Sequence, residues 1–154
     1  MNWRKRVLEF GLALVIFLLF MNLIPLWQDY KNTALPVSAW FEVHDIVVPN
    51  HAQASNPSVV YDRTIHEAIN GAWTVEVQEN KEGFPNVCQG SGRSTYSPDS
   101  QLPDPLTWAW MIGKSCAVPP GIYRWEVSYT FSRDSYPDKS AVFYSNFFEV
   151  SPSQ

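Results

Sequence analysis

Hydrophobic residues are distributed very differently in the two parts of this chain. Residues 7–27 form a mostly apolar run, whose centre from Phe10 to Met21 holds no charge and no strongly polar side chain. A helix of that length rises about 31 Å at roughly 1.5 Å per residue, and the hydrocarbon core of a bilayer is about 30 Å thick. The pattern therefore predicts one membrane-spanning helix over residues 7–27.

Charge around this run predicts its orientation. Three basic residues precede it, namely Arg4, Lys5 and Arg6, whereas Lys31 is the only basic residue among the first thirty that follow. The positive-inside rule then predicts a cytoplasmic basic tip at residues 1–6 and an exported chain from about Gln28. We expect a single-pass protein of the inner, cytoplasmic membrane whose C-terminal part is periplasmic or extracellular.

A cleaved secretory signal is the alternative reading of the same segment. Such a signal needs small residues a few positions after the apolar run, and the best pair here is Val37 and Ala39. Both lie well beyond Trp27, which favours an uncleaved anchor followed by a short stalk at residues 28–38. Either reading exports the rest of the chain.

Beyond the stalk, apolar and polar residues alternate, as in half-buried strands. The clearest case is Gly121–Ser132, whose large side chains share one face: Tyr123, Trp125, Val127, Tyr129 and Phe131. Ala141–Ser151 is the predicted partner strand, and these residues are expected on one face of it: Val142, Tyr144, Phe148 and Val150. The loop Arg133–Ser140 contains a Tyr-Pro-Asp-Lys turn, so the domain is expected to end in a hairpin.

Four further strands are predicted upstream: Ala39–Val48, Ser58–Thr64, Ala72–Gln78 and Leu106–Ile112. Gln89–Pro105 is rich in Ser, Gly, Pro and Asp and is predicted to be a long surface loop. Six strands separated by turn signals, with no amphipathic helical stretch, predict a mainly β protein. Residues 39–154 are therefore expected to form a small β-sandwich.

Composition limits the partners and the compartment. Residues 28–154 hold 14 acidic residues (15 less Glu9) and 8 basic ones (11 less the three at the N-terminus), a net charge of −6. This balance argues against nucleic acid and against anionic lipid headgroups as partners. The only cysteines, Cys88 and Cys116, both lie in the exported part, where a disulfide is expected. The alternative, a nucleophilic cysteine, is less favoured because neither has a histidine nearby in sequence.

Few residues qualify for catalysis or metal binding. The one group that merits a test as a metal site is His44, Asp45, His51, His66 and Glu67. No two of these histidines have the i, i+2 or i, i+4 spacing that makes a metal motif specific, so surface or structural roles are favoured. The chain also lacks a Gly-x-Ser-x-Gly motif. We therefore expect no enzymatic activity, no metal and no cofactor.

Aromatic residues are the better candidates for binding. Trp108 and Trp110 share one face of their predicted strand, and Arg93 and Tyr96 lie in the predicted loop before it. We assign these four as candidate contacts for a protein partner, although core filling is the favoured role for large aromatic residues that share a strand face.

Tyr61, Asp62 and Arg63 form a compact polar group within another predicted strand. In an undistorted strand Asp62 and Arg63 point to opposite faces. A structural ion pair and a partner-binding edge both remain open for them.

Some motifs resemble known envelope proteins. The Pro-Gly-x-Tyr-x-Trp pattern at Pro120–Trp125 resembles late strands of immunoglobulin-like and fibronectin-type modules, in which a Tyr near the strand start makes a corner contact. The layout is similar to that of small membrane-anchored proteins of bacteriophages and prophages, through the anchor, the strand at Val60–Arg63, one cysteine pair and the ending at Asn146–Val150. The chain departs from immunoglobulin domains because Cys116 precedes the Tyr123 strand. The resemblance thus implies an immunoglobulin-like fold at the cell envelope and a bridge that pins a loop, but no activity.

Together these features predict an anchored, exported β-sandwich that acts as a protein-interaction module on an envelope partner, possibly of phage origin. One alternative is a ligand-binding, metal-binding or enzymatic domain that uses His44, His51 and His66. Another is a structural subunit whose helix at residues 7–27 packs within a larger membrane complex.

Overall fold

The computed structural model describes residues 3–134 and 136–153, except for the side chains of residues 4–8, 31 and 32. The chain divides into two compact units, residues 1–35 and residues 36–154. We call the second the β unit. The chain is mainly β, with an apolar helix at its N-terminus.

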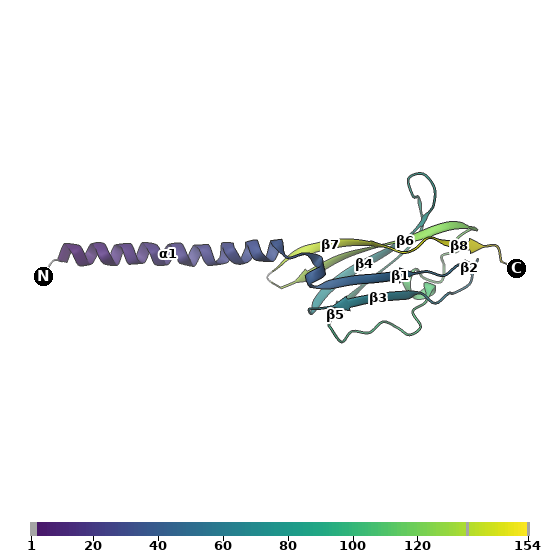
Figure 1. The fold of residues 1–154 in the computed structure, drawn as a ribbon, viewed down its shortest axis with the longest axis horizontal. Helices are drawn as coiled ribbons and strands as arrows, with labels where there is room; N and C mark the ends of the chain where they lie inside the picture. Colours follow the sequence, from purple (N-terminus) through teal and green to yellow (C-terminus); the bar gives the residue numbers. More distant parts are fainter. Residues whose placement is uncertain (1–2, 135, 154) are drawn as a thin grey trace. The chain divides into compact units, whose positions relative to one another are not determined.

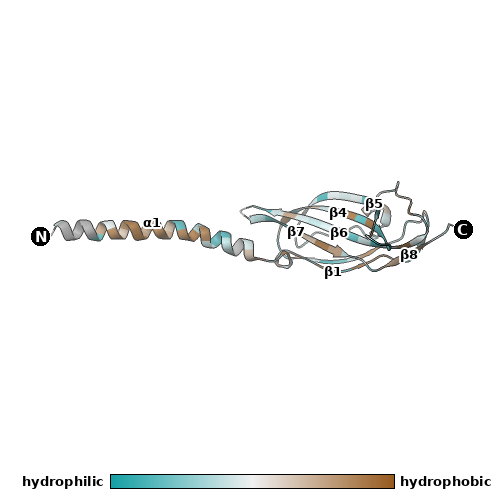
Figure 2. Ribbon diagram, turned by 90° about the horizontal axis from the view of Figure 1, so that it is seen from above, coloured by the Kyte–Doolittle hydropathy of each residue, from teal (hydrophilic) through white to brown (hydrophobic). Residues whose placement is uncertain are grey.

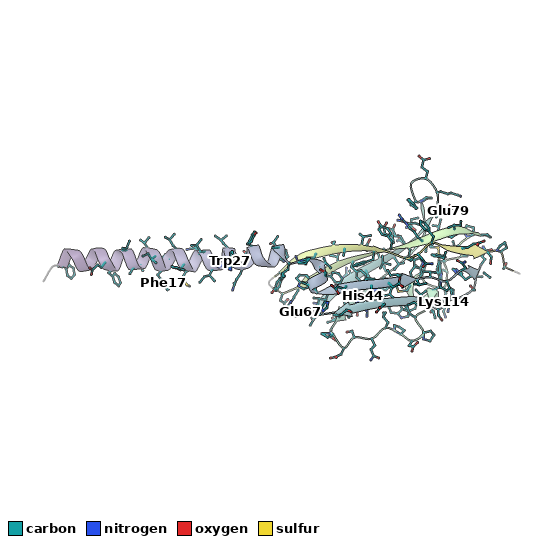
Figure 3. All side chains as sticks on the ribbon, in the orientation of Figure 1. Phe17, Trp27, His44, Glu67, Glu79 and Lys114 are labelled. Atoms are coloured by element: carbon teal, nitrogen blue, oxygen red, sulfur yellow. A yellow bond between two sulfur atoms is a disulfide. The ribbon has the colours of Figure 1, made fainter. Side chains whose placement is uncertain are left out.

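Helix α1 (Trp3–Ala34) contains the predicted membrane segment. Within it, Glu9–Tyr30 has a mean hydropathy of 2.3, and none of its most apolar window is buried. Figure 2 shows the hydrophobic residues along this helix, and Figure 3 shows the side chains of Phe17 and Trp27 on its surface. The chain therefore has an N-terminal helix that is long and apolar enough to span a membrane.

The helix continues past the predicted end of the membrane segment at Trp27. Residues 28–34 of the predicted stalk at residues 28–38 are therefore helical, and the short 3₁₀ helix η1 (Val37–Ala39) follows. The side chains that carry the orientation prediction, Arg4, Lys5 and Arg6, lie outside the described residues, so the orientation stays a prediction.

Two sheets make up most of the β unit (Figure 1). The strands are β1 (Phe41–Val47), β2 (His51–Ala52), β3 (Val60–Ile65), β4 (Ile69–Glu79), β5 (Asn86–Tyr96), β6 (Gly121–Arg133), β7 (Tyr136–Tyr144) and β8 (Phe148–Ser151). β1 and β3 form an antiparallel two-stranded sheet. The large sheet has the order β2-β8-β6-β4-β5, with β7 also paired to β6.

The two sheets bury one hydrophobic core between them. The alternation predicted along β6 is confirmed, because its five large odd-numbered side chains, Tyr123 to Phe131, are all buried. From the small sheet, the Phe41 ring lies with its centroid 4.9 Å from those of both Tyr129 and Phe131. Burying a side chain of this size stabilises a fold by about 1.5–3 kcal/mol, so these contacts hold the small sheet against the large one.

A one-residue insertion separates β7 from β8. Both strands pair with the same edge of β6, where Glu126 lies opposite Tyr144 and Tyr123 opposite Phe148. Residues 145–147 therefore face only two residues of β6, as in a β-bulge, and the direction of alternating side chains reverses across the insertion.

The reversal corrects one sequence prediction. Phe148 and Val150 are buried as expected, but Val142 and Tyr144 are about half exposed on the outer face. The prediction that these four residues share one face was wrong, because it assumed an unbroken strand.

The insertion also joins the two sheets through Asn146. Its Oδ1 accepts a hydrogen bond from the backbone N–H of Val48 (2.8 Å), and its Nδ2 donates to the Val48 carbonyl oxygen (3.0 Å). The side-chain amide thus replaces a strand residue, because it satisfies both backbone groups of a fully buried position. Near the start of β6, the Tyr123 hydroxyl donates to the Pro119 carbonyl oxygen (2.9 Å), the corner contact that the resemblance implied.

The predicted strand Leu106–Ile112 was wrong, since its centre forms the short helix α2 (Trp108–Met111). Short apolar runs fit a strand or a helix equally well. Here the start of the helix is fixed from afar, because Asn56 Oδ1 accepts a hydrogen bond from the Ala109 N–H (2.8 Å). Gly113 has a φ of +95° just after the helix, which suits its termination.

The predicted surface loop Gln89–Pro105 was also partly wrong, because its first half belongs to strand β5. β5 pairs with β4 over nearly its whole length. Cys88 on β5 is bonded to Cys116 in the connection between α2 and β6, with 6.0 Å between their Cα atoms. The predicted disulfide is therefore present, and it ties a loop to a strand, as the resemblance implied.

Candidate functional site

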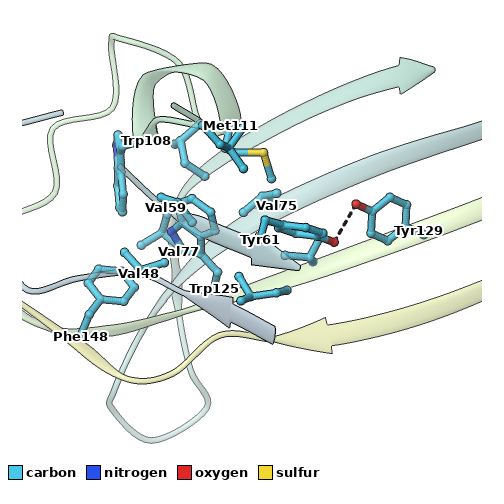
Figure 4. Close-up of a cluster of buried hydrophobic side chains, with 14 of the residues drawn as sticks. Val48, Val59, Tyr61, Val75, Val77, Trp108, Met111, Trp125, Tyr129 and Phe148 are labelled. Atoms are coloured by element: carbon cyan, nitrogen blue, oxygen red, sulfur yellow. Dashed lines mark hydrogen bonds between the residues drawn. The ribbon is translucent and has the colours of Figure 1, made fainter. Parts of the chain in front are cut away.

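A pocket of about 90 Å³ opens on the inner face of the large sheet, beside its edge strand β5. We call it the aromatic pocket. Its walls come from β3, β4, β5, β6, α2 and residues 101–103, and its characteristic members are Tyr61, Arg63, Trp73, Tyr96, Trp110 and Tyr129. Figure 4 shows the buried cluster behind it, with Met111 of α2 above and the pair of Tyr61 and Tyr129 to one side.

The pocket forms where the small sheet ends. Beyond β3, the inner face of β5 is covered by α2 and by the connection that leads to it. Two glycines of β5 allow this close cover. A Cβ at Gly90 would overlap the carbonyl oxygen of Met111, and a Cβ at Gly92 would lie 2.6 Å from the ring of Trp73. The absence of side chains at Gly90 and Gly92 is therefore what allows α2 and Trp73 to lie against the strand.

Trp110 stands at the mouth of the pocket. Its ring stacks on that of Trp73, with 5.7 Å between centroids and 19° between planes. Trp110 is 48% exposed, whereas Trp108 is 5% exposed and packs against Trp125 in the core. The prediction that Trp108 and Trp110 share one face was wrong, because residues two apart on a helix point in different directions. Trp108 is a core residue, and Trp110 is available for contact.

Tyrosine hydroxyl groups form the polar part of the pocket wall. The hydroxyls of Tyr61 and Tyr129 lie 2.8 Å apart and share a hydrogen bond. Burial raises the pKa of Tyr61, and the neighbouring Tyr129 raises it further. Burial also raises the pKa of Tyr129 and of Tyr96, although the positive charge of Arg63 lowers both in part. All three hydroxyls are therefore protonated at neutral pH.

Arg63 supplies a positive charge to the same wall. Its guanidinium lies 5.0 Å from the ring centroid of Tyr96 and 5.8 Å from that of Phe41. Among the described residues no carboxylate lies within 4.0 Å of it. Asp62 is exposed on the other face of the strand, as predicted. The structural ion pair considered for Arg63 is therefore absent within that part of the chain, and the half-buried cation is balanced only by aromatic rings and hydroxyls.

The two other predicted contact residues, Arg93 and Tyr96, lie on opposite faces of β5. Tyr96 is buried in the pocket wall, but Arg93 lies at an odd position of β5 and faces the outer side of the sheet. Both were assigned to one loop, whereas in a strand they point to opposite faces. Trp73 was not predicted as a site residue. The feature of the sequence that could have indicated it is Gly92, because a residue without a side chain leaves room for the ring of Trp73.

The histidines are not brought together. His44 Nε2 lies 2.7 Å from Thr64 Oγ1, and His66 Nε2 lies 3.4 Å from Glu42 Oε2. Figure 3 labels His44 on β1. His51 lies instead on β2, with its ring 5.1 Å from that of Trp108. In the described ranges no group of three or more His, Cys, Asp or Glu residues is placed to hold a metal ion.

A second aromatic group lies on the outer face of the large sheet around Arg124. The guanidinium lies 3.9 Å from the ring centroid of Phe84 and 4.5 Å from that of Tyr144. Phe147 is 5.9 Å away, and Nε donates a hydrogen bond to Gln78 Oε1 (3.0 Å). We call these residues the Arg124 cluster. Unlike Arg63, Arg124 is enclosed by three rings and a hydrogen-bonding amide.

Comparison with protein-family models, with curated proteins and with solved structures finds no match to this chain. The resemblance to phage envelope proteins and to immunoglobulin-like modules therefore stays a prediction. Function is best argued from the geometry of the aromatic pocket.

Proposed function

We propose that the chain is a single-pass inner-membrane protein whose β unit is exported and binds a protein partner of the cell envelope through the aromatic pocket. The apolar helix at Glu9–Tyr30 supports the anchor, because its length and hydropathy suit a bilayer. The bond between Cys88 and Cys116 supports export, since such bridges persist in oxidising compartments.

The observation that carries the proposal is the stacked pair of Trp73 and Trp110 at the mouth of the pocket. Trp110 presents about half of its surface to solvent while its ring is held by Trp73. A pre-positioned indole of this kind loses little conformational entropy on binding, and tryptophan is enriched among residues that dominate interface energies. The held indole is therefore suited to be a contact point.

The size of the pocket favours a protein partner over a free small molecule. Pockets for drug-sized ligands measure roughly 300–1,000 Å³. The aromatic pocket measures about 90 Å³, which accommodates one side chain or chain end. A partner that inserts one group and rests the remainder on Trp110 fits this shape.

Site-specific photocrosslinking of the full-length chain in membranes tests the proposal. A benzoylphenylalanine at Gln101, an exposed residue of the pocket wall, is expected to yield one discrete crosslinked protein. The same probe at Thr130, exposed on the outer face of β6, serves as the control and is expected to give no such product.

The contact is assigned by two matched variants. Trp110→Ala is expected to abolish the crosslink from Gln101, whereas Phe147→Ala in the Arg124 cluster is expected to preserve it. The opposite result would move the binding surface to the outer face. A product that survives both changes but disappears when residues 7–27 are replaced by an unrelated anchor would favour the structural-subunit alternative.

A further inference from the structure

The aromatic pocket holds more hydrogen-bond donors than its own residues consume. Tyr61 and Tyr129 have two hydroxyl hydrogens between them but share a single hydrogen bond. One O–H therefore remains available to a further acceptor, and the Tyr96 hydroxyl lies in the same wall. Because burial raises the pKa of all three tyrosines, these groups stay donors at neutral pH.

The charge in the pocket is positive, so it favours the same kind of group as the hydroxyl donors do, which is an anion. Arg63 is half buried, and none of the residues that line the pocket is acidic. The β unit as a whole has an excess of acidic residues, yet within the described residues none of them pairs with this guanidinium. A guanidinium beside neutral hydroxyl donors is the arrangement that binds a carboxylate through charge-assisted hydrogen bonds.

The rest of the pocket lining is mainly apolar, with Ser94 and Gln101 as its polar members. Trp73 and Trp110 form one side, and Leu102, Pro103 and Met111 form another. An occupant that reaches the donors contacts these apolar side chains along part of its length, which favours a charged end carried on an apolar stem. The pocket volume of about 90 Å³ limits that stem to the size of one aliphatic side chain.

We infer that the aromatic pocket binds a carboxylate carried on a short apolar stem, with Arg63 and the tyrosine hydroxyls as its partners. This inference rests on the proposed function and names the chemistry of the group that the envelope partner inserts. Two sources supply that chemistry in a protein: a C-terminal carboxylate on an apolar residue, and the side chain of a glutamate.

The test uses the full-length chain in detergent micelles, labelled with 5-fluorotryptophan and observed by fluorine NMR. The first probes are isovalerate and isovaleramide, which have the same shape but differ in charge. Isovalerate is expected to shift the resonances of Trp73 and Trp110 with a Kd on the order of millimolar, as befits so small a ligand. Loss of the charge-assisted hydrogen bonds is expected to weaken binding of the amide by about tenfold or more. Trp40 is buried and does not line the pocket, so its resonance is expected to stay unchanged and reports that the fold is intact.

Two arginine variants assign the charge. Arg63→Gln is expected to remove the preference for the acid over the amide, whereas Arg93→Gln, on the outer face of the sheet, is expected to keep it. Arg63→Lys is expected to retain part of the preference, because the charge remains while the planar donor group is lost. If Arg63→Gln disturbs the Trp40 resonance, the role of the charge is tested by Arg63→Lys and by the comparison of isovalerate with isovaleramide in the unmodified chain.

Blocked peptides separate the two sources. Acetyl-Ala-Ala-Leu with a free carboxylate is compared with its C-terminal amide and with acetyl-Ala-Glu-Ala-amide. Binding of the first alone assigns a chain end, and binding of the third assigns a glutamate side chain. If acids and amides bind equally, or no acid shifts Trp110, the inference is overturned.

The two proposals fail separately. If Trp110→Ala abolishes the Gln101 crosslink but the pocket shows no preference for acids, the proposed protein interaction is supported and the binding of a carboxylate is contradicted. If the pocket clearly prefers acids but Trp110→Ala leaves the crosslink unchanged, the proposed protein interaction through this pocket is contradicted. The carboxylate would then not come from the crosslinked partner.

Discussion

Replacement of Asn146 by alanine should test whether one side-chain amide joins the two sheets of the β unit. The variant removes three hydrogen bonds, in which the Val48 N–H donates to Oδ1 and Nδ2 donates to the carbonyl oxygens of Val48 and Phe147. Val48 is fully buried whereas Asn146 is exposed, so both Val48 backbone groups lose their partners at a site that is partly shielded from water. An unsatisfied buried group costs about 1–3 kcal/mol, and we therefore expect the free energy of unfolding to fall by about 2–4 kcal/mol.

Thermal and denaturant unfolding of the full-length chain in micelles, followed by near-ultraviolet circular dichroism, measures this loss. For a domain of this size it corresponds to a fall in Tm of roughly 8–16 °C. Asn50→Ala is the matched control, because Asn50 Oδ1 accepts a single hydrogen bond, from the Glu149 N–H, at an exposed position. A loss in Asn146→Ala no greater than in Asn50→Ala would show that Val48 finds other partners and that Asn146 does not join the sheets.

Two further changes probe the bridge and the buried hydroxyls. Replacing Cys88 and Cys116 by serine should lower the free energy of unfolding by about 3.5 kcal/mol, as chain entropy predicts for a separation of 28 residues. Unfolding with and without a reductant measures it, and an unchanged midpoint would contradict this estimate. Burial raises the pKa of Tyr61 above its unfolded value of about 10, so the contribution of Tyr61 to the free energy of unfolding should be constant below about pH 10. It should fall as the pH rises further, because the unfolded chain loses this proton first. Tyr61→Phe should reduce that slope by up to about 1.4 kcal/mol per pH unit in titrated unfolding experiments, and an unchanged slope would show that Tyr61 ionises equally in both states.

The sequence was most informative where one face of a strand is buried and the other is exposed. Along β6 each odd-numbered large residue lies in the core, so a local pattern of period two was sufficient to predict both the strand and its inner face. The apolar helix was equally visible, because its length and lack of charge need no tertiary information. The pairing of Cys88 with Cys116 followed from their number and expected compartment.

The errors share a physical cause, which is dependence on distant contacts. The insertion at residues 145–147 adds one residue against β6, and nothing in the local pattern marks it. α2 is fixed at its start by Asn56, which is 53 positions from Ala109 in sequence. β5 is rich in glycine and serine and has a low intrinsic preference for strands, but its pairing with β4 overrides that preference.

The candidate site was predicted in pieces. Arg63, Tyr96 and Trp110 were each noted, yet their assembly into one pocket depends on α2 being a helix and on β5 being a strand. With β5 read as a loop, Arg93 and Tyr96 seemed equivalent, whereas alternation places only Tyr96 on the inner face. Trp73 emerged only once Gly92 was seen to lie beneath its ring.

The position of the pocket follows from the unequal width of the two sheets. The two-stranded sheet reaches β5 only near Tyr96, where Phe41 and Arg63 contact its ring, and α2 covers β5 at Gly90. This cover is held by few backbone hydrogen bonds, such as the one from the Val59 N–H to the Leu106 carbonyl oxygen (2.8 Å), and by the bond from Cys88 to Cys116 just after α2. The disulfide therefore fixes the wall that carries Trp110 as well as stabilising the fold, which accounts for the position of the chain's cysteine pair at this edge of the sheet.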